Sequence, residues 1–344
     1  MQPSTIAGWS LPGCSKGLSV VIPCYNEAAI LPELHRRVSA VCRETVGDYE
    51  LVLVNDGSAD ETWPIMVSLS ADDPNLVCVN LSRNHGHQLA LTAGLSLCRG
   101  ERILILDADL QDPPELLPTM MAAIDNGADV AYGQREHRDG ETAFKRATAY
   151  LFYRLMNMIA DQYIPEDTGD FRLITRRVLR VFSAMPESHR FIRGMIAWVG
   201  FKQVGIRYRR APRVTGATKF TLRRMASFAL DAITSFSVKP LRLALYAGFS
   251  LCVASIGLFV VSLWAYLAHD TVRGWMSLTS IVLLFFAAQF LFLGLIGEYL
   301  GRLYLESKRR PLFIVDAVVC GGQESGDDPG CVPAGHALPK RLER

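Results

Sequence analysis

The sequence lacks the cysteine pattern of a disulfide-stapled protein. Its eight cysteines are scattered along 344 residues, and no two of them stand in C-x-x-C spacing. We therefore expect reduced thiols in a cytosolic setting rather than a disulfide framework. The first 17 residues, MQPSTIAGWSLPGCSKG, also lack the basic stretch followed by an apolar run that a signal peptide needs.

Charge is missing altogether from two long segments. Residues 243–268 and 275–297 contain no Asp, Glu, Lys or Arg, and each exceeds the roughly 20 residues that cross a hydrocarbon core. A buried helix of this length normally shows a polar face, so two membrane spans are the better interpretation. Lys and Arg flank both outer ends, whereas the connecting loop HDTVRG carries only Arg273. The positive-inside rule then predicts a hairpin with both chain ends in the cytoplasm.

Acidic residues are scarce just ahead of the first span. Between Arg172 and Arg242 there are 16 Lys and Arg but only two acids, Glu187 and Asp231, in a chain whose net charge is +2. So basic a block beside a membrane favours anionic headgroups or phosphates as partners. No recognition motif for nucleic acid accompanies it, and we expect no nucleic-acid partner.

Short apolar runs alternate with helical patterns from residue 18 to residue 132. The runs cover residues 18–23, 50–56, 76–82, 102–109 and 129–133. Runs rich in Val, Ile and Leu that alternate with helices predict an α/β fold, with a mostly parallel sheet covered by helices on both faces.

Polar clusters follow four of these runs. They are PCYNE (23–27), NDGS (55–58), RNHG (83–86) and DAD (107–109). Because ligands bind at the carboxyl ends of strands in open α/β sheets, the clusters predict one shared site. Two carboxylates, Asp107 and Asp109, can face a common cation there, and oxygen ligands suit Mg²⁺ or Mn²⁺. Since Mg²⁺ usually takes only one or two protein carboxylates, a phosphorylated ligand is expected to complete its coordination.

Six motifs in order resemble a known family. They are VVIPCYNE, VLVNDGS, LSRNHGHQLALTAGL, LILDADLQDPPE, TGDFRLI and HRFIRGMIAWVGF. Together they are similar to the family 2 glycosyltransferases, and more narrowly to the polyprenyl-phosphate glycosyltransferases, which include dolichyl-phosphate mannosyltransferase and the bacterial bactoprenol glucosyltransferases. The resemblance runs from residue 18 to residue 310 and includes the membrane hairpin of the bacterial members.

The resemblance implies a domain organisation. Residues 18–220 would form a cytosolic domain of the GT-A type, a Rossmann-like, mostly parallel sheet flanked by helices, after an N-terminal extension of residues 1–17. Residues 143–160 and 221–242 read as amphipathic helices at the membrane interface. Residues 243–310 would hold the transmembrane hairpin, and the polar segment 311–344 is expected to be mostly disordered.

The resemblance also implies a nucleotide-sugar site. The base and ribose would contact Pro23, Tyr25, Glu27, Val54 and Asp56. The divalent metal, Mg²⁺ or Mn²⁺, would be held against the diphosphate by Asp107 and Asp109, with Ala108 and Gln111 nearby. The positions that hold the diphosphate and the donor sugar in the family are matched by Arg135, Arg213 and Lys219.

The implied reaction is inverting transfer of a sugar to a polyprenyl phosphate at the cytoplasmic face of the inner (plasma) membrane. That acceptor is mostly dianionic at pH 7, because its second pKa lies near 6, so it is already a nucleophile. Asp170 in TGDFR matches the residue usually called the base, yet we expect it to position the acceptor, the sugar or the metal; with Asp109 and Arg135 it completes the candidate catalytic set. Candidates for binding the acceptor phosphate are Arg172, Arg190 and Arg193, of which the last two read equally well as interfacial arginines.

The donor's identity stays open at this point. The bacterial hairpin favours UDP over GDP, and the pattern does not choose among sugars. The family resemblance favours a homo-oligomer, with a homotetramer as the first guess.

Other functions fit the sequence less well. A processive polysaccharide synthase needs a Q-x-x-R-W motif, which precedes none of the five tryptophans. A sugar nucleotidyltransferase needs a glycine-rich basic loop where PCYNE stands. A catalytically inactive membrane scaffold would not need the acids and cations that are intact here. We expect His85 and His87 to serve in helix capping and hydrogen bonding rather than as metal ligands.

Overall fold

The computed structural model describes residues 16–135, residues 168–208 except 189, residues 275–321, and the single residues 246, 249, 250, 253 and 257. The chain divides into two units, one of residues 1–146, 164–219 and 311–344, the other of residues 147–163 and 220–310. The interfacial helices predicted over 143–160 and 221–242 lie outside the described residues, as do Arg213, Lys219 and almost all of the first predicted span.

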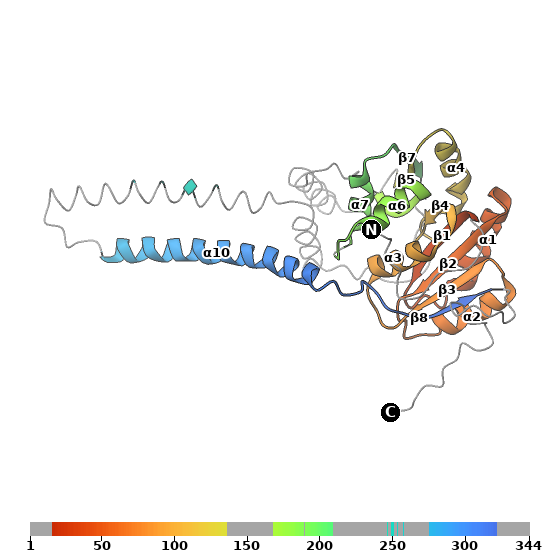
Figure 1. Ribbon diagram of the computed structural model, residues 1–344, viewed down its shortest axis with the longest axis horizontal. Helices are drawn as coiled ribbons and strands as arrows, with labels where there is room; N and C mark the ends of the chain where they lie inside the picture. Colours follow the sequence, from red (N-terminus) through yellow and green to blue (C-terminus); the bar gives the residue numbers. More distant parts are fainter. Residues whose placement is uncertain are drawn as a thin grey trace, which may run out of the picture. The chain divides into compact units, whose positions relative to one another are not determined.

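A sheet of eight strands forms the centre of the first unit (Figure 1). Its order is β7-β5-β6-β4-β1-β2-β3-β8, in which β6 and β8 run antiparallel to their neighbours and the other pairings are parallel. This confirms the predicted mostly parallel α/β sheet. The strands are β1 (Lys16–Cys24), β2 (Tyr49–Asn55), β3 (Leu76–Leu81), β4 (Gly100–Ile105), β5 (Val130–Arg135), β6 (Thr168–Thr175), β7 (Gln203–Tyr208) and β8 (Val315–Cys320).

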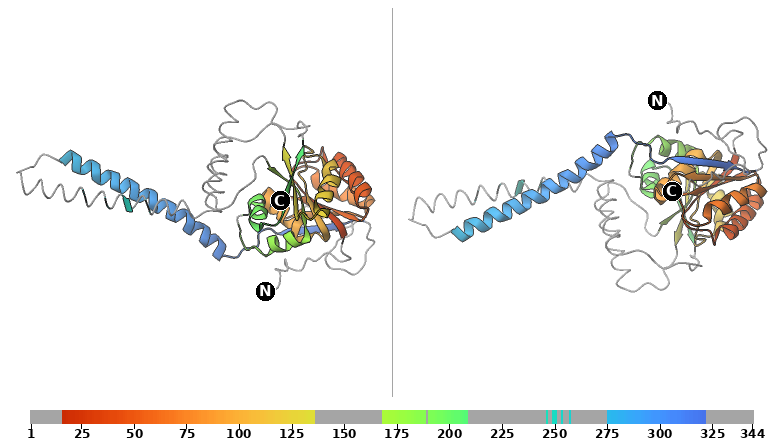
Figure 2. Two further views of the ribbon diagram at one scale, coloured as in Figure 1. Left: turned by 90° about the horizontal axis from the view of Figure 1, so that it is seen from above. Right: turned by 90° about the horizontal axis from the view of Figure 1, so that it is seen from below.

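Helices cover both faces of this sheet (Figure 2). Strands β1 and β2 are buried on both sides, as their unbroken apolar runs predict for a sheet between two helical layers. One face carries α1 (Leu31–Thr45), α2 (Thr62–Asp72) and α4 (Leu117–Asp125), which follows the short 3-10 turn η1 (Pro114–Leu116). The other face carries α3 (His87–Leu97), α6 (Arg176–Ala184) and α7 (Ile192–Val199).

The carboxyl-terminal segment departs from our expectation. Residues 315–320 form β8, which pairs with β3 at the edge of the sheet (Figure 1), although 311–344 was expected to be mostly disordered. The reason lies in the run FIVDAVVC, whose β-branched residues suit a strand and whose Val318 and Val319 are fully buried. Cys320, the last residue of β8, is disulfide-bonded, contrary to the expectation of reduced thiols, whereas Cys24, Cys42, Cys78 and Cys98 are free as expected.

The helix α10 (Trp275–Ser307) belongs to the second unit and contains the second predicted span. Large apolar side chains stand exposed along it, among them Leu278, Val282, Phe286, Phe290 and Leu293. Within the part of the chain that the structure describes, no helix meets the combined length and apolarity required of a membrane span.

Candidate active site

The polar strand ends meet at one edge of the sheet. Strands β1, β2 and β4 are parallel, so PCYNE, NDGS and DAD emerge side by side at their carboxyl ends. Strand β6 runs the other way beside β4, so its beginning, which carries Asp170, lies at the same edge. Strand β4 ends at Ile105, earlier than the predicted run 102–109, and this leaves Asp107 and Asp109 beyond the strand.

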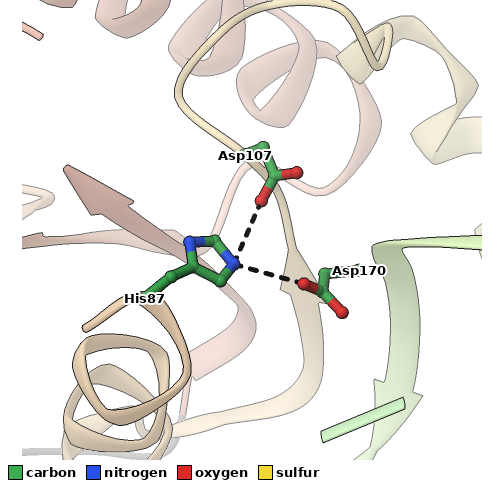
Figure 3. Close-up of side chains that lie close together, drawn as sticks. All are labelled: His87, Asp107 and Asp170. Carbon is green, nitrogen blue, oxygen red and sulfur yellow. Dashed lines mark hydrogen bonds and ion pairs between the residues drawn. The ribbon is translucent and has the colours of Figure 1, made fainter. Parts of the chain in front are cut away.

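His87 lies between two of these carboxylates (Figure 3). Its Nε2 is 3.2 Å from Oδ2 of Asp170 and 3.5 Å from Oδ1 of Asp107. His87 is the first residue of α3, so the helix delivers the ring to the carboxyl edge of the sheet. The predicted hydrogen-bonding role is confirmed for His87, but no side-chain hydrogen bond caps α3.

Asp170 is buried and fully engaged. It is 3% exposed, its Oδ1 accepts a 2.8 Å hydrogen bond from Nε of Arg193, and its Oδ2 accepts from Nε2 of Gln88 at 3.2 Å. Burial alone raises the pKa of this carboxyl, but the positive charge of Arg193 and the hydrogen bonds from His87 and Arg193 outweigh it and hold the pKa well below the usual range. A carboxylate with so low a pKa is a poor proton acceptor.

Asp107 has the opposite environment. Burial raises its pKa to about 6, and the charges of Asp170, Asp112 and Asp109 add to this rise while His87 opposes it. Its Oδ1 is buried and accepts no hydrogen bond. Burial lowers the pKa of His87, but the hydrogen bond to Asp170 and the charge of Asp107 prevail, so the net shift is upward. An anionic oxygen without a donor, facing a histidine and a second carboxylate, is a place where a cation fits.

Three side chains offer possible metal ligands. The ligand atoms of His87, Asp107 and Asp170 all lie within 4.8 Å of one another. Among the described residues, these three form the group of His, Cys, Asp or Glu side chains that could hold a metal ion. Asp109, the second ligand predicted from sequence, is not part of it. Its Oδ1 accepts a 3.1 Å hydrogen bond from the backbone N of Gln111, across a turn in which Leu110 has a φ of 52°. Ala108 and Gln111 are both buried in this turn.

Asp56, one of the residues predicted to contact the nucleotide, is held by backbone N–H groups. Its Oδ1 accepts from the backbone N of His85 at 2.7 Å and its Oδ2 from that of Gly86 at 3.0 Å. Burial raises the pKa of Asp56, against the effect of these two N–H groups. Tyr25 is 49% exposed and Glu27 is partly buried, whereas Pro23 and Val54 are buried within β1 and β2.

The candidate arginines have different surroundings. Arg172 is buried, donates to the backbone carbonyls of Gly169 and Asp170, and has its pKa lowered to about 10 by burial. Arg193 reaches Asp170, as described. The guanidinium of Arg190 donates to three backbone carbonyls around the end of α6 and lies 4.9 Å over the ring of Phe182, contacts that stabilise the end of this helix. Arg135 is the last residue of β5, and its side chain lies outside the described part.

Sequence reasoning missed Gln88. While its Nε2 donates to Asp170, its Oε1 accepts a 2.9 Å hydrogen bond from the backbone N of Ile192, the first residue of α7. Gln88 thus joins α3, β6 and α7 at the site. The available signal was a second polar side chain in the first turn of an otherwise apolar helix, directly after His87.

Comparisons with known proteins show the family of the chain. Residues 19–182 match the family Glycosyl transferase family 2, and residues 239–303 match the GtrB C-terminal hairpin. An uncharacterized glycosyltransferase of Bacillus subtilis is 45% identical over 298 residues, covering 86% of this chain and 92% of its own length. The chain belongs to glycosyl transferase family 2. This confirms the resemblance of the six motifs, and the protein is a glycosyltransferase with a GT-A type, Rossmann-like domain.

Other relatives of this family 2 glycosyltransferase carry more specific names. A prophage bactoprenol glucosyl transferase homolog of Escherichia coli is 38% identical over 305 residues, covering 88% of this chain and 99% of the relative. A bactoprenol glucosyl transferase of Shigella phage SfV is 38% identical over 302 residues, 87% of this chain and 97% of its own. Among solved structures, mannosyl-3-phosphoglycerate synthase from Rubrobacter xylanophilus has a TM-score of 0.45 at 18% identity, over 66% of this chain and 74% of that one.

Proposed function

We propose that this glycosyltransferase transfers a sugar from a nucleotide-sugar, with UDP-sugars favoured, to a polyprenyl phosphate at the cytoplasmic face of the membrane, with inversion at the anomeric carbon. The names of the relatives support the acceptor class, because the likeness extends over nearly their whole length. The observation that carries the proposal is the anionic Asp170, locked by Arg193, Gln88 and His87 beside Asp107 at the carboxyl edge of the sheet.

The site fits a divalent metal. The Oδ1 of Asp107, which accepts no hydrogen bond, would be its first ligand, with Asp109 the second carboxylate of the predicted pair and His87 within reach. Mixed oxygen and imidazole ligands suit Mn²⁺ better than Mg²⁺, which prefers oxygen alone. When bound, such a metal supplies Lewis-acid stabilisation of the negative charge that grows on the departing nucleoside diphosphate.

In this proposal Asp170 orients a neighbouring side chain and does not act as a base. The acceptor phosphate is a dianion and needs no deprotonation, and the low pKa of Asp170 makes it a poor base. Its carboxylate instead fixes the guanidinium of Arg193, whose Nε it occupies. A guanidinium held in this orientation suits an anionic oxygen of the acceptor, in the geometry that guanidinium groups offer phosphates.

The membrane part of the proposal rests on sequence and on α10. Two uncharged segments, residues 243–268 and 275–297, form a hairpin that brings the active site to the lipid acceptor. The exposed apolar side chains of α10 and the match of residues 239–303 to a hairpin family support this. A homo-oligomer, with a tetramer as first guess, is a further part of the proposal.

The experiment uses the purified full chain in detergent with Mn²⁺ and undecaprenyl phosphate. A panel of radiolabelled UDP- and GDP-sugars is supplied, and label extracted into organic solvent is counted. We expect label from one donor, and none when undecaprenol without its phosphate replaces the acceptor. Absence of lipid-soluble label from every donor would contradict the proposal.

A further inference from the structure

A series of hydrogen bonds runs from the last strand of the sheet to the loop after the first. Oδ2 of Asp316 accepts from Nδ2 of Asn80 at 3.0 Å, and Oδ1 of Asn80 accepts from Nδ2 of Asn55 at 2.7 Å. Oδ1 of Asn55 accepts from the backbone N of Ser58 at 3.2 Å, and Oγ of Ser58 accepts from the backbone N of Asn26 at 3.0 Å. These five residues, the hydrogen-bond relay, cross from β8 over β3 and β2 to the end of β1.

The relay has a fixed direction. A carboxylate has no hydrogen to donate, so Asp316 turns the NH₂ group of Asn80 toward itself. The carbonyl oxygen of Asn80 must then face the NH₂ group of Asn55, and the carbonyl oxygen of Asn55 is left to accept from a backbone N–H. An acceptor at Asp316 therefore determines which end of each amide points along the edge of the sheet. Asn55 is 2% exposed, so water does not readily replace its partners.

The hydrogen-bond relay ends at the loop after β1, which contains a residue with a left-handed backbone conformation. Asn26 has a left-handed φ of 56°, and its Oδ1 accepts from the backbone N of Ala59 at 2.9 Å, so the loops after β1 and β2 are tied in both directions. The next residue is held as well, because the backbone N of Glu27 donates to Oγ1 of Thr62 at 2.9 Å. Tyr25 and Glu27, on either side of Asn26, are the residues proposed for the nucleotide.

We propose that Asp316 is a positioning residue for the donor nucleotide, acting through Asn80 and Asn55 on the loop that carries Tyr25 and Glu27. The inference rests on the proposed function in one respect, that the nucleotide binds at this loop. It gives the strand that follows α10 a part in building the donor half of the active site, a part that no motif at residues 311–321 indicates.

The test measures UDP affinity by isothermal titration calorimetry on the full chain in detergent with Mn²⁺. Asp316→Asn keeps an acceptor oxygen and should bind UDP within about twofold of the unmodified protein. Asp316→Ala removes the acceptor and should weaken UDP binding about fivefold, the effect of roughly one hydrogen bond. Asp316→Lys should weaken it at least about tenfold, because its ammonium donates toward Asn80, reverses the relay and sets the NH₂ group of Asn55 against the N–H of Ser58.

The Lys variant separates the relay from simple electrostatics. An added positive charge attracts an anionic nucleotide, so without the relay Asp316→Lys would tighten UDP binding. Asp72→Lys makes the same charge change on an exposed residue at the end of α2 and should leave affinity unchanged. Asn80→Ala breaks the relay at a second point and should match Asp316→Ala.

Two results would overturn the inference. One is UDP affinity that stays within twofold in both Asp316→Ala and Asp316→Lys while their melting temperatures fall, since that would reduce β8 to a structural strand. The other is an equal loss in Asp72→Lys. Because the titration needs no acceptor, a relay effect in a protein that fails to glycosylate undecaprenyl phosphate would sink the proposed acceptor and leave this inference standing. In a protein that does transfer sugar, the donor KM should rise as the Kd does, with kcat within about twofold.

Discussion

The two carboxylates on either side of His87 have pKa values that are shifted in opposite directions. Asp170 is held ionised by Arg193 and His87, whereas Asp107, whose side chain is 27% exposed, lacks an equivalent set of donors and has its pKa raised to about 6. Environments that push the pKa values of neighbouring acids apart assign them different tasks. Asp170 orients the guanidinium of Arg193, and Asp107 is the carboxylate that we propose as a ligand of the divalent cation.

The raised pKa of Asp107 predicts that Asp107→Asn increases the stability of the fold in a pH-dependent way. The folded-state pKa of about 6 exceeds the ordinary value of 3.8, so ionised Asp107 lowers stability. That cost is absent below about pH 4 and complete above about pH 6. In EDTA, Asp107→Asn should raise the melting temperature at pH 7.5 and leave it unchanged at pH 4. Calorimetry at both pH values checks this, and Mn²⁺ at pH 7.5 should stabilise only the unmodified protein; an equal gain at both pH values would contradict the assignment.

The role of Arg193 in binding the acceptor can be tested with Arg190 as the control residue. Arg193→Ala leaves the buried charge of Asp170 without its main partner and removes the proposed phosphate contact, so kcat/KM for the acceptor should fall about 10- to 100-fold with the donor KM little changed. Arg190→Ala removes hydrogen bonds and a ring contact around the end of α6. It should lower the melting temperature and keep activity within about threefold. Similar activity losses in both variants would argue against a specific role for Arg193.

At the scale of the element, α3 has to lie close to the sheet to deliver His87 and Gln88. Gly94 makes this possible, because a Cβ there would lie 2.4 Å from Cγ1 of Val21 and 2.9 Å from Cγ2 of Val54. Both neighbours belong to strands in the middle of the sheet and have little room to move.

Gly94→Ala should therefore destabilise the fold despite the higher helix propensity of alanine. We expect a loss of about 1–3 kcal/mol in the free energy of unfolding, the usual range for overpacking. Activity should fall more than stability explains, since the displaced helix carries His87 and Gln88 away from Asp170. Urea unfolding together with initial rates measures both. The exposed Ser96→Ala on the same helix serves as the control and should change neither.

The sequence was a good guide to elements with simple patterns. The five apolar runs became β1 to β5 within a few residues, because a parallel strand buried on both faces is apolar throughout. Strand β6 escaped prediction, since TGDFRLIT places a buried Asp170 and Arg172 inside a strand and hides its apolar character. β7 is a half-exposed edge strand with a weak pattern, and β8 stands directly before a polar tail that resembles disorder.

The site was predictable only in part, for a similar reason. Acids that follow strands were visible in the sequence, because the carboxyl edge of a parallel sheet is a general rule. The contact between His87 and Asp170 joins residues 83 positions apart, and no spacing rule indicates it. Arg190 was indistinguishable from Arg193 until the fold turned one toward α6 and the other toward Asp170.

At the scale of the whole molecule, the chain returns to its first unit after α10. β8 covers the outer edge of β3 and buries Val318 and Val319. The backbone just after β8 packs closely against the end of α2, because a Cβ on Gly321 would lie 1.8 Å from the carbonyl oxygen of Asp73.

Two truncations should differ sharply. Ending the chain after Ile314 removes β8, and each buried valine accounts for about 1.5–3 kcal/mol of apolar burial. We expect a lower melting temperature, weaker UDP binding and aggregation through the open edge of β3. Ending it after Gly321 keeps β8 and Gly321 and should preserve all three properties. Thermal scans and size-exclusion chromatography compare the two, and equal behaviour would argue against a structural role for β8.

The position of β8 also sets an order on biosynthesis. A ribosome completes β1 to β7, then α10, and only afterwards the strand that closes the edge of β3. Strand β8 therefore pairs with β3, and Asp316 reaches Asn80, only after residues 239–303 have been synthesised. On the inference drawn above, a chain stalled or cleaved before that point lacks Asp316 and would bind the donor nucleotide about fivefold more weakly than the complete chain.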